Sequence, residues 1–341
     1  MNFHFGKKGL ISGLVLFVLL GMGCGAWYYY APNQVSEVKE EVIEIRSGDT
    51  GSEIAEHLYE KGLISSTTAF RVALRIHGVM DKLQQGYYQM PNNLSLSEVI
   101  EKLQQGDVKT IRVTIPEGFN IREIASRMET QGFGSAKDFL TEAETFAPYD
   151  YMYGAKPVQY RSEGFLFPAT YDFPLNASPK EVQAMMAKEM NAKLTKELEP
   201  RLNEFLKAHN MSVFDFVVLA SLVEKEAFLD EDRPLIAAAF LKRLQIQMPL
   251  QSCASIEYLL GTRKPVLSLE DIQVESPYNT YLNAGLPPGP IANPGMKSMR
   301  AVLDAKATED IFFVADTKGR HHFSKTYEEH LEKIESIYGK Q

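Results

Sequence analysis

The stretch Ser-Val-Phe-Asp-Phe-Val-Val-Leu-Ala-Ser-Leu-Val-Glu-Lys-Glu, residues 212–226, decides the fold of this chain. Ser212 with Asp215 three residues later is typical of a capping box, which predicts that a helix begins here. At about 100° per residue, one face of that helix gathers apolar side chains: Phe216, Leu219, Ala220, Val223 and Ala227. The stretch therefore predicts a helix with an apolar body that ends in two glutamates.

The two glutamates, Glu224 and Glu226, are separated by their spacing. Residues two apart point to roughly opposite sides of a helix, so these carboxylates cannot share one cleft. Glu226 follows Leu222 by one turn and Leu219 by two, on the flank of the apolar face. Apolar neighbours disfavour a charged carboxyl and raise its pKa, which would let Glu226 act as a general acid near neutral pH. The alternative is that both glutamates are solvated at a helix end.

The composition is that of an ordinary globular protein. The chain has 341 residues, which suggests about two domains beyond any membrane segment, and 45% of the residues are apolar. A net charge of −8 without a large basic block argues against nucleic acid as a partner. The two cysteines, Cys24 and Cys253, lie far apart in the sequence and predict no disulfide between them.

The N-terminal segment has the pattern of a membrane anchor. After a tail over 1–9 that holds Lys7 and Lys8, residues 10–31 carry no charge and are long enough to cross a bilayer. Aromatic residues end this span, where an interfacial belt is expected. Because the basic side comes first, we expect a single-pass protein of the inner (cytoplasmic) membrane with a cytoplasmic N-terminus and an exported remainder. A tether over 32–41 would follow, and a signal peptide cleaved near Cys24 is the alternative.

A pattern then repeats at an offset of 70 residues. Seven residues recur: Ile45, Gly48, Glu53, Ile54, Ala55, Gly62 and Ser65 match Ile115, Gly118, Glu123, Ile124, Ala125, Gly132 and Ser135. Each copy predicts a strand and two helices: 42–45, 52–61 and 67–77 in the first, and 111–115, 120–130 and 136–143 in the second. The first copy adds a returning strand over 86–90 and a helix over 95–104. We therefore expect one module over 42–108 and a second strand-helix-helix unit over 109–155.

The remainder, residues 156–341, predicts an α+β domain. Residues 156–173 are aromatic and loop-like, with a core strand as the alternative. Further helices are predicted in several ranges: two within 178–209, then 233–244, 255–260 and 326–338. A strand is predicted over 311–315, and the proline-rich run 285–295 predicts a rigid loop. No spacing of His, Asp and Glu predicts a zinc site.

Ordered motifs cover most of the chain. They are Glu-Gly-Phe-Leu-Phe-Pro-Ala-Thr-Tyr at 163–171, Leu-Ala-Ser-Leu-Val-Glu-Lys-Glu at 219–226, Phe-Leu-Lys-Arg-Leu at 240–244, Pro-Leu-Gln-Ser at 249–252, Ser-Pro-Tyr-Asn-Thr-Tyr at 276–281, Gly-Leu-Pro-Pro-Gly-Pro-Ile-Ala-Asn-Pro-Gly at 285–295, Phe-Phe-Val-Ala-Asp at 312–316 and His-Phe-Ser at 322–324. In this order they resemble the YceG-like endolytic murein transglycosylases, the MltG family. The resemblance also implies that the module over 42–108 is LysM-like and binds glycan, with a structural spacer as the alternative.

The resemblance implies an endolytic peptidoglycan lytic transglycosylase, a carbon–oxygen lyase acting on the MurNAc–GlcNAc bond of nascent glycan strands. It would leave 1,6-anhydro-MurNAc ends and terminate strand elongation, beside peptidoglycan synthases and without a cofactor or metal. The family's catalytic acid maps onto Glu226. We assign substrate contacts to Glu163, Glu224, Gln251, Tyr278, Asn279, Thr280, Tyr281 and His322. The alternatives are a muramidase with Glu163 as its second carboxylate and a non-catalytic wall-binding scaffold.

Two positions depart from the family pattern. Ala169 and Cys253 stand where the family usually has aspartate. No motif pairs Cys253 with a histidine, so we interpret it as a packed side chain and not as a nucleophile. The two departures keep the scaffold alternative open.

Overall fold

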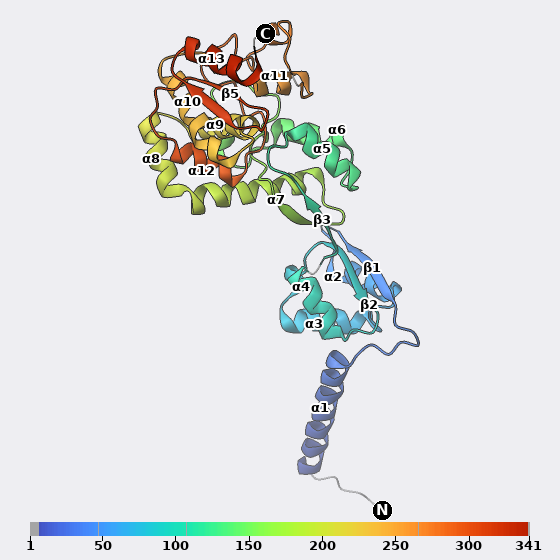
Figure 1. The fold of residues 1–341 in the computed structure, drawn as a ribbon. Coiled ribbons are helices and arrows are strands. Elements are labelled where there is room, and N and C mark those ends of the chain that lie inside the picture. The colour runs from blue at the N-terminus through green and yellow to red at the C-terminus, as the bar shows by residue number, and fades with distance from the viewer. Residues whose placement is uncertain (1–6, 47, 107, 265, 340–341) are drawn as a thin grey trace, which may run out of the picture. The chain divides into compact units, whose positions relative to one another are not determined.

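The predicted α+β class is confirmed by the computed structural model, which describes residues 7–46, 48–106, 108–264 and 266–339 (Figure 1). Within these ranges, thirteen α-helices accompany three two-stranded sheets. The chain divides into two compact units, which we describe separately. The first holds residues 1–111 and 172–176, and the second holds 112–171 and 177–341.

The first unit contains the first copy of the repeat. Its elements are α1 (Lys7–Tyr30), β1 (Glu40–Ile45), α2 (Gly51–Glu60), α3 (Thr67–His77), η1 (Met80–Lys82), β2 (Gly86–Pro91) and α4 (Leu96–Gln105). β1 pairs antiparallel with β2, from Glu40 opposite Pro91 to Ile45 opposite Gly86. Capping boxes at Thr50 and Ser95 begin α2 and α4, as their sequences require. The predicted strand-helix-helix-strand order of this copy is confirmed.

The link after α1 is held against this module at its start. The Asn33 side-chain amide donates to the carbonyls of Gly62 at 3.0 Å and Asn92 at 2.9 Å, and the Asn33 backbone N–H donates to Leu94 at 3.1 Å. The expected tether over 32–41 is therefore fixed at its beginning. In the described part of the chain no single helix is long and apolar enough to cross a membrane. The helices Glu199–His209 and Val213–Glu226, which meet at a bend of 96°, reach that length and apolar character only together.

The second copy of the repeat continues the same order of elements. β3 (Thr110–Thr114), α5 (Ile121–Thr130) and α6 (Ala136–Thr145) lead to β4 (Thr170–Pro174), which pairs with β3. β4 begins at Thr170, so the last residues of the aromatic stretch 156–173 form a strand. A strand was the alternative to the predicted loop there. The boundary between the two units passes through this two-stranded sheet.

The second unit carries the remaining elements. They are η2 (Asp150–Met152), α7 (Pro179–Ala192), the π-helical turn η3 (Lys193–Glu197), α8 (Glu199–His209), α9 (Val213–Glu226), η4 (Asp230–Asp232), α10 (Arg233–Gln245), α11 (Cys253–Leu260), η5 (Asp271–Gln273), α12 (Met296–Asp304), β5 (Phe312–Ala315), β6 (His321–Ser324) and α13 (Tyr327–Tyr338). The predicted helices over 233–244, 255–260 and 326–338 are confirmed to within two residues. The sequence analysis did not predict α12.

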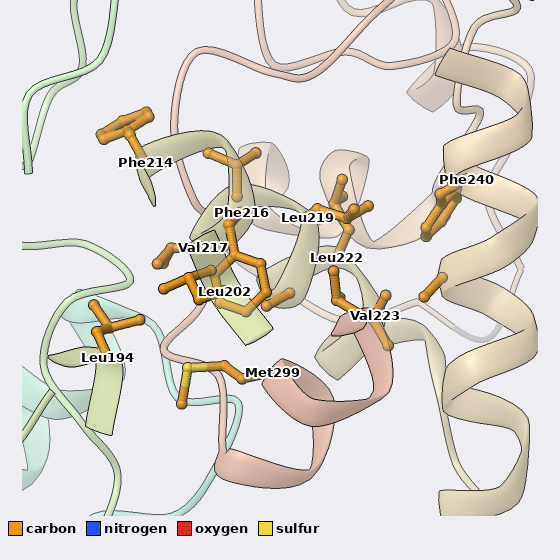
Figure 2. Packing of buried hydrophobic residues seen from close by; sticks show 14 of the residues in the cluster. Leu194, Leu202, Phe214, Phe216, Val217, Leu219, Leu222, Val223, Phe240 and Met299 are labelled. Carbon is orange, nitrogen blue, oxygen red and sulfur yellow. The ribbon is translucent and has the colours of Figure 1, made fainter. Parts of the chain in front are cut away.

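The core of the second unit forms around α9. Nine of its residues are buried, Phe214 and all of 216–223, so the expectation of a single apolar face was too narrow. Figure 2 shows why: side chains leave α9 in several directions, with Phe240 of α10 and Met299 of α12 lying around them. Each buried Val, Leu or Phe side chain stabilises the fold by about 1.5–3 kcal/mol. α9 is therefore a central helix with an enclosed body, and its two ends are polar.

Candidate active site

The C-terminal end of α9 carries two glutamates in different surroundings. The helix begins with the predicted capping box, in which the Ser212 hydroxyl accepts from the Asp215 N–H at 3.1 Å. It ends at Glu226, and Ala227 continues in an extended conformation. As the spacing predicts, the partners of Glu224 and Glu226 come from different segments.

Glu226 is half-buried and held by one segment of the chain. The Ser252 hydroxyl donates a short hydrogen bond to Oε1, and the Ala254 N–H approaches the same oxygen at 3.5 Å. Burial raises the pKa of Glu226 above its ordinary value, while these two donors oppose the shift. Among the described residues, no Lys or Arg forms an ion pair with this carboxyl. Oε1 is therefore the oxygen that accepts both of these hydrogen bonds.

The loop that contains Thr280 holds Ser252 in place. The Ser252 N–H donates to the Thr280 hydroxyl at 2.9 Å, and the Gln251 N–H donates to the Thr280 carbonyl at 2.9 Å. The backbone of Gln251 adopts a left-handed conformation with a φ of 47°, and Gln251 is exposed. Buried Thr280 thus fixes the segment that reaches Glu226, and the structure brings two predicted site residues to this point.

Two further basic side chains lie near Glu226. Arg243 is buried and donates to the carbonyls of Leu250 and Ile311, so it ties the Ser252 segment to the β5 region. His321 is buried beside Asp232, whose Oδ2 accepts from the His321 N–H at 2.8 Å and lies 3.2 Å from Nδ1. A positive charge on His321 lowers the pKa of Glu226, against the larger effect of burial.

Glu224 forms a closed ionic contact on the other side of the helix end. Its side chain is 6% exposed, and Oε1 lies 3.3 Å from Nη1 of Arg233, whose side chain is 9% exposed. Oε2 accepts from the Gly295 N–H, the N-cap of α12, at 3.0 Å. Its carboxylate therefore joins α9, α10 and α12.

Glu163 lies in the interior of the second unit, 2% exposed. Both of its oxygens accept from the Ile121 N–H at 3.1 Å, at the start of α5, and Tyr258 and Asn293 donate at 3.2 and 3.3 Å. Burial raises the pKa of Glu163 to about 7, although the N–H of Ile121 and the hydroxyl of Tyr258 oppose the shift. Through Tyr258, whose ring lies 5.3 Å from that of Tyr278, Glu163 supports the loop that holds Thr280.

The remaining residues assigned to substrate have distinct surroundings. Asn279 is fully buried, and its amide donates to the carbonyls of Ile272 at 3.0 Å and Val274 at 2.8 Å. Tyr278 is half-buried with its ring 5.3 Å from that of Tyr258. The Tyr281 hydroxyl lies 3.1 Å from the sulfur of Cys253.

His322 lies at the hairpin between β5 and β6. Its Nε2 is 3.1 Å from Asp316 Oδ2, and its side chain is 39% exposed. In the register of the hairpin, His322 pairs with Val314 and His321 with Ala315, so the two imidazoles point to opposite faces. The histidine with an electrostatic effect on Glu226 is therefore His321, which the sequence analysis did not assign to the site.

Cys253 is exposed, so its interpretation as a packed side chain is wrong. It is the first residue of α11, and the following N–H group, that of Ala254, is directed at Glu226. Partial desolvation raises the pKa of its thiol, which favours the neutral form. The thiol therefore lacks the activation expected of a nucleophile.

Ser252 lies inside a family motif but was not among the predicted site residues. The signal was its place in Pro-Leu-Gln-Ser, next to the predicted residue Gln251. What the sequence could not show is a contact across 26 positions, from the hydroxyl of Ser252 to the carboxyl of Glu226.

Comparisons with known proteins agree with the motifs. The model of the YceG-like family matches residues 43–336. An endolytic murein transglycosylase of Bacillus subtilis (strain 168) is 32% identical over 301 residues, covering 84% of this chain and 82% of the relative. An endolytic murein transglycosylase of Streptococcus pneumoniae serotype 2 is 32% identical over an aligned length of 359 residues, covering 95% of this chain and 64% of the relative.

One solved structure is similar over nearly the whole chain. It is a 2.6 Å crystal structure of a yceG-like protein from Listeria monocytogenes, 31% identical, with a TM-score of 0.59. The match covers 87% of this chain and 100% of the other. The resemblance drawn from the motifs is thus confirmed, and this chain belongs to the YceG-like family.

Proposed function

We propose that this protein is an endolytic murein transglycosylase, a lyase that cleaves peptidoglycan between MurNAc and GlcNAc and leaves 1,6-anhydro-MurNAc ends. The observation that carries the proposal is the carboxyl of Glu226. It is half-buried, its pKa is raised by burial, and it has hydrogen-bond donors on Oε1. A raised pKa favours the protonated form of the carboxyl, which a general acid requires. The names of the relatives from B. subtilis and S. pneumoniae support the same activity.

The reaction needs one carboxyl acting twice. The protonated carboxyl of Glu226 gives its proton to the glycosidic oxygen as the bond from that oxygen to C1 of MurNAc breaks. The C6 hydroxyl of the same sugar then forms a bond to C1, and its proton passes to the Glu226 carboxylate, which restores the acid. No water is consumed, and the intramolecular attack profits from proximity. The hydrogen bond from Ser252 stabilises the carboxylate in the middle of this cycle.

The muramidase alternative needs a second carboxylate that activates water. Glu163 was its candidate, but that side chain is 2% exposed and accepts four hydrogen bonds from within the protein. These contacts favour a positioning role for Glu163, in which it secures the start of α5. A transglycosylase needs no second carboxylate of this kind.

The substrate-binding residues fall into two groups. Gln251, Tyr278, Tyr281 and His322 retain accessible surface and are proposed to contact sugar. Buried Asn279 and Thr280 are proposed to shape the loop that those side chains stand on, and Glu224 to fix the end of α9.

The cellular setting follows from the N-terminal part of the chain. We propose that residues 10–31 cross the inner membrane with the N-terminus in the cytoplasm, which would hold the enzyme near nascent strands and peptidoglycan synthases. The order β1, α2, α3, β2 supports a LysM-like module over 42–108. Whether that module binds glycan is a separate proposal, and a pull-down of the full chain by purified glycan strands tests it.

Digestion of purified sacculi tests the activity. Muropeptides released by the purified protein are expected to carry 1,6-anhydro-MurNAc ends, one water lighter than the reducing ends that a muramidase leaves. Mass spectrometry distinguishes the two. Reducing ends would establish hydrolysis, and release of neither product by a folded protein would favour the scaffold.

A further inference from the structure

The helix α3 of the first unit presents an unusual exposed surface. Val72 is 50% exposed and Ile76 is 75% exposed, and their spacing of four places them on one face. Arg71 and Arg75 flank this face, and the helix holds no acidic residue. The other side of α3 is buried against the module through Phe70 and neighbouring side chains. A helix with a basic flank beside exposed aliphatic side chains is typical of a membrane-surface helix.

Both ends of α3 are attached to the same level of α1. The Tyr28 hydroxyl lies 2.5 Å from that of Ser65, two residues before α3 begins. The Tyr29 ring stacks on His77, the last residue of α3, at 4.9 Å and 21°. Tyr28 and Tyr29 are separated by only about 1.5 Å along the axis of α1. α3 therefore lies across the end of α1, as Figure 1 also shows.

The exposed face of α3 is directed back along α1. A groove of about 770 Å³ is lined by Val72 and Ile76 on one side and by Val18 and Met22 of α1 on the other. The α1 side chains in this groove precede Tyr28 by up to ten residues, which is about 15 Å along the helix. If α1 crosses a bilayer, this face of α3 is directed at its hydrocarbon.

We propose that α3 lies in the headgroup layer of the membrane, with Val72 and Ile76 in contact with acyl chains and Arg71 and Arg75 beside anionic lipid phosphates. The inference rests on the proposed membrane anchor. The module would then be fixed to the membrane surface.

The experiment uses the single tryptophan of the chain, Trp27. The full-length protein is reconstituted in bilayers of phosphatidylglycerol and phosphatidylcholine brominated near the headgroup, and Trp27 emission reports insertion of α1. A Trp27→Phe, Ile76→Trp variant then reports the position of α3. The matched control is Trp27→Phe, Tyr87→Trp. Residue 87 lies near the start of β2, whereas the module contacts Asn33 beyond the other end of this strand, at Asn92.

The expected result is a blue-shifted emission from position 76 and quenching several-fold stronger than at position 87. Quenching of Trp27 without quenching at position 76 would overturn the proposed lipid contact while leaving the anchor intact. If Trp27 itself is not quenched, the anchor fails, and the inference fails with it. Equal quenching at positions 76 and 87 would show that the module does not direct α3 toward the membrane, and this also overturns the proposal.

Discussion

The two sides of the C-terminal end of α9 use the same type of residue for different purposes. On one side, Glu224 is matched by the Arg233 cation and by the N–H of Gly295. On the other, Glu226 receives neutral donors from Ser252 and Ala254 and has no paired cation among the described residues.

The difference shows what separates a structural carboxylate from a reactive one. Glu224 has a cation for its charge, and Arg233 holds two carboxylates, because Asp230 lies 3.1 Å from its Nε. Glu226 is disfavoured as an ion by burial, so its pKa rises and its proton is available for transfer. Position on a helix wheel separates the two glutamates, but only the partners assign their roles.

The largest expected effect is on catalysis, from Glu226→Gln. This change keeps the size of the side chain but removes the proton donor, so release of anhydro-muropeptides should fall roughly 100-fold or more, in line with general acid catalysis. The thermal melt should stay near that of the wild type. Wild-type cleavage by this variant, with a dead but folded Glu224→Gln protein, would exchange the two roles.

Glu224→Gln should instead act on stability. Arg233 keeps Asp230 as a partner, so the free energy of unfolding should drop by about 1.5–3 kcal/mol, the weight of a hydrogen bond between charged groups. Below the melting transition the variant should keep more activity than Glu226→Gln. Denaturant titration measures the loss, and an unchanged midpoint would mean that the contact with Arg233 contributes nothing.

The third glutamate, Glu163, extends the comparison to a fully enclosed carboxyl. Its pKa is about 4.3 in an unfolded chain and about 7 in the folded protein. Because the folded pKa is raised, its favourable contribution is complete below the unfolded pKa and is lost as the pH rises through about 7. Relative to Glu163→Gln, the wild type should lose roughly 3–4 kcal/mol of stability between pH 4 and pH 8. Denaturant titrations of both proteins across this range test it, and a constant difference would show that Glu163 stays ionised inside the protein.

The smallest expected effect comes from Ser252→Ala. The lost hydrogen bond stabilises the carboxylate of Glu226, so its pKa should rise and the alkaline limb of the pH–rate profile should move to higher pH. Cleavage should fall about 10-fold, the typical weight of a hydrogen bond to a charged group. Ser252→Thr retains the hydroxyl and should restore both values. Loss of rate without movement of the limb would instead indicate a general disturbance of the loop.

Much of the fold was readable from local sequence. Ser212, Thr50 and Ser95 each sit where a helix begins, because a cap depends only on residues three apart. α12 was missed because its N-cap is Gly295, at the end of a proline-rich run that reads as a loop. The Gly295 N–H is satisfied by Glu224, which is distant in the sequence, so no local signal announces this helix.

The site was only partly readable for a related reason. Family motifs and the helix wheel both selected Glu226, but Ser252 and Asp232 reach the site through tertiary contacts. The histidines illustrate the limit: alternation on a strand says that His321 and His322 face opposite ways, but only the packing of the hairpin decides that His321 meets Asp232.

The boundary between the two units passes through β3 and β4, and this affects the order in which the units can fold during synthesis. Residues 172–176 complete the first unit, yet sixty residues of the second unit, 112–171, precede them in the chain. The N-terminal unit therefore cannot finish folding as soon as its own main segment has been synthesised. A single proteolytic cut between residues 112 and 171 would leave each fragment with part of both units, so neither unit would be released whole.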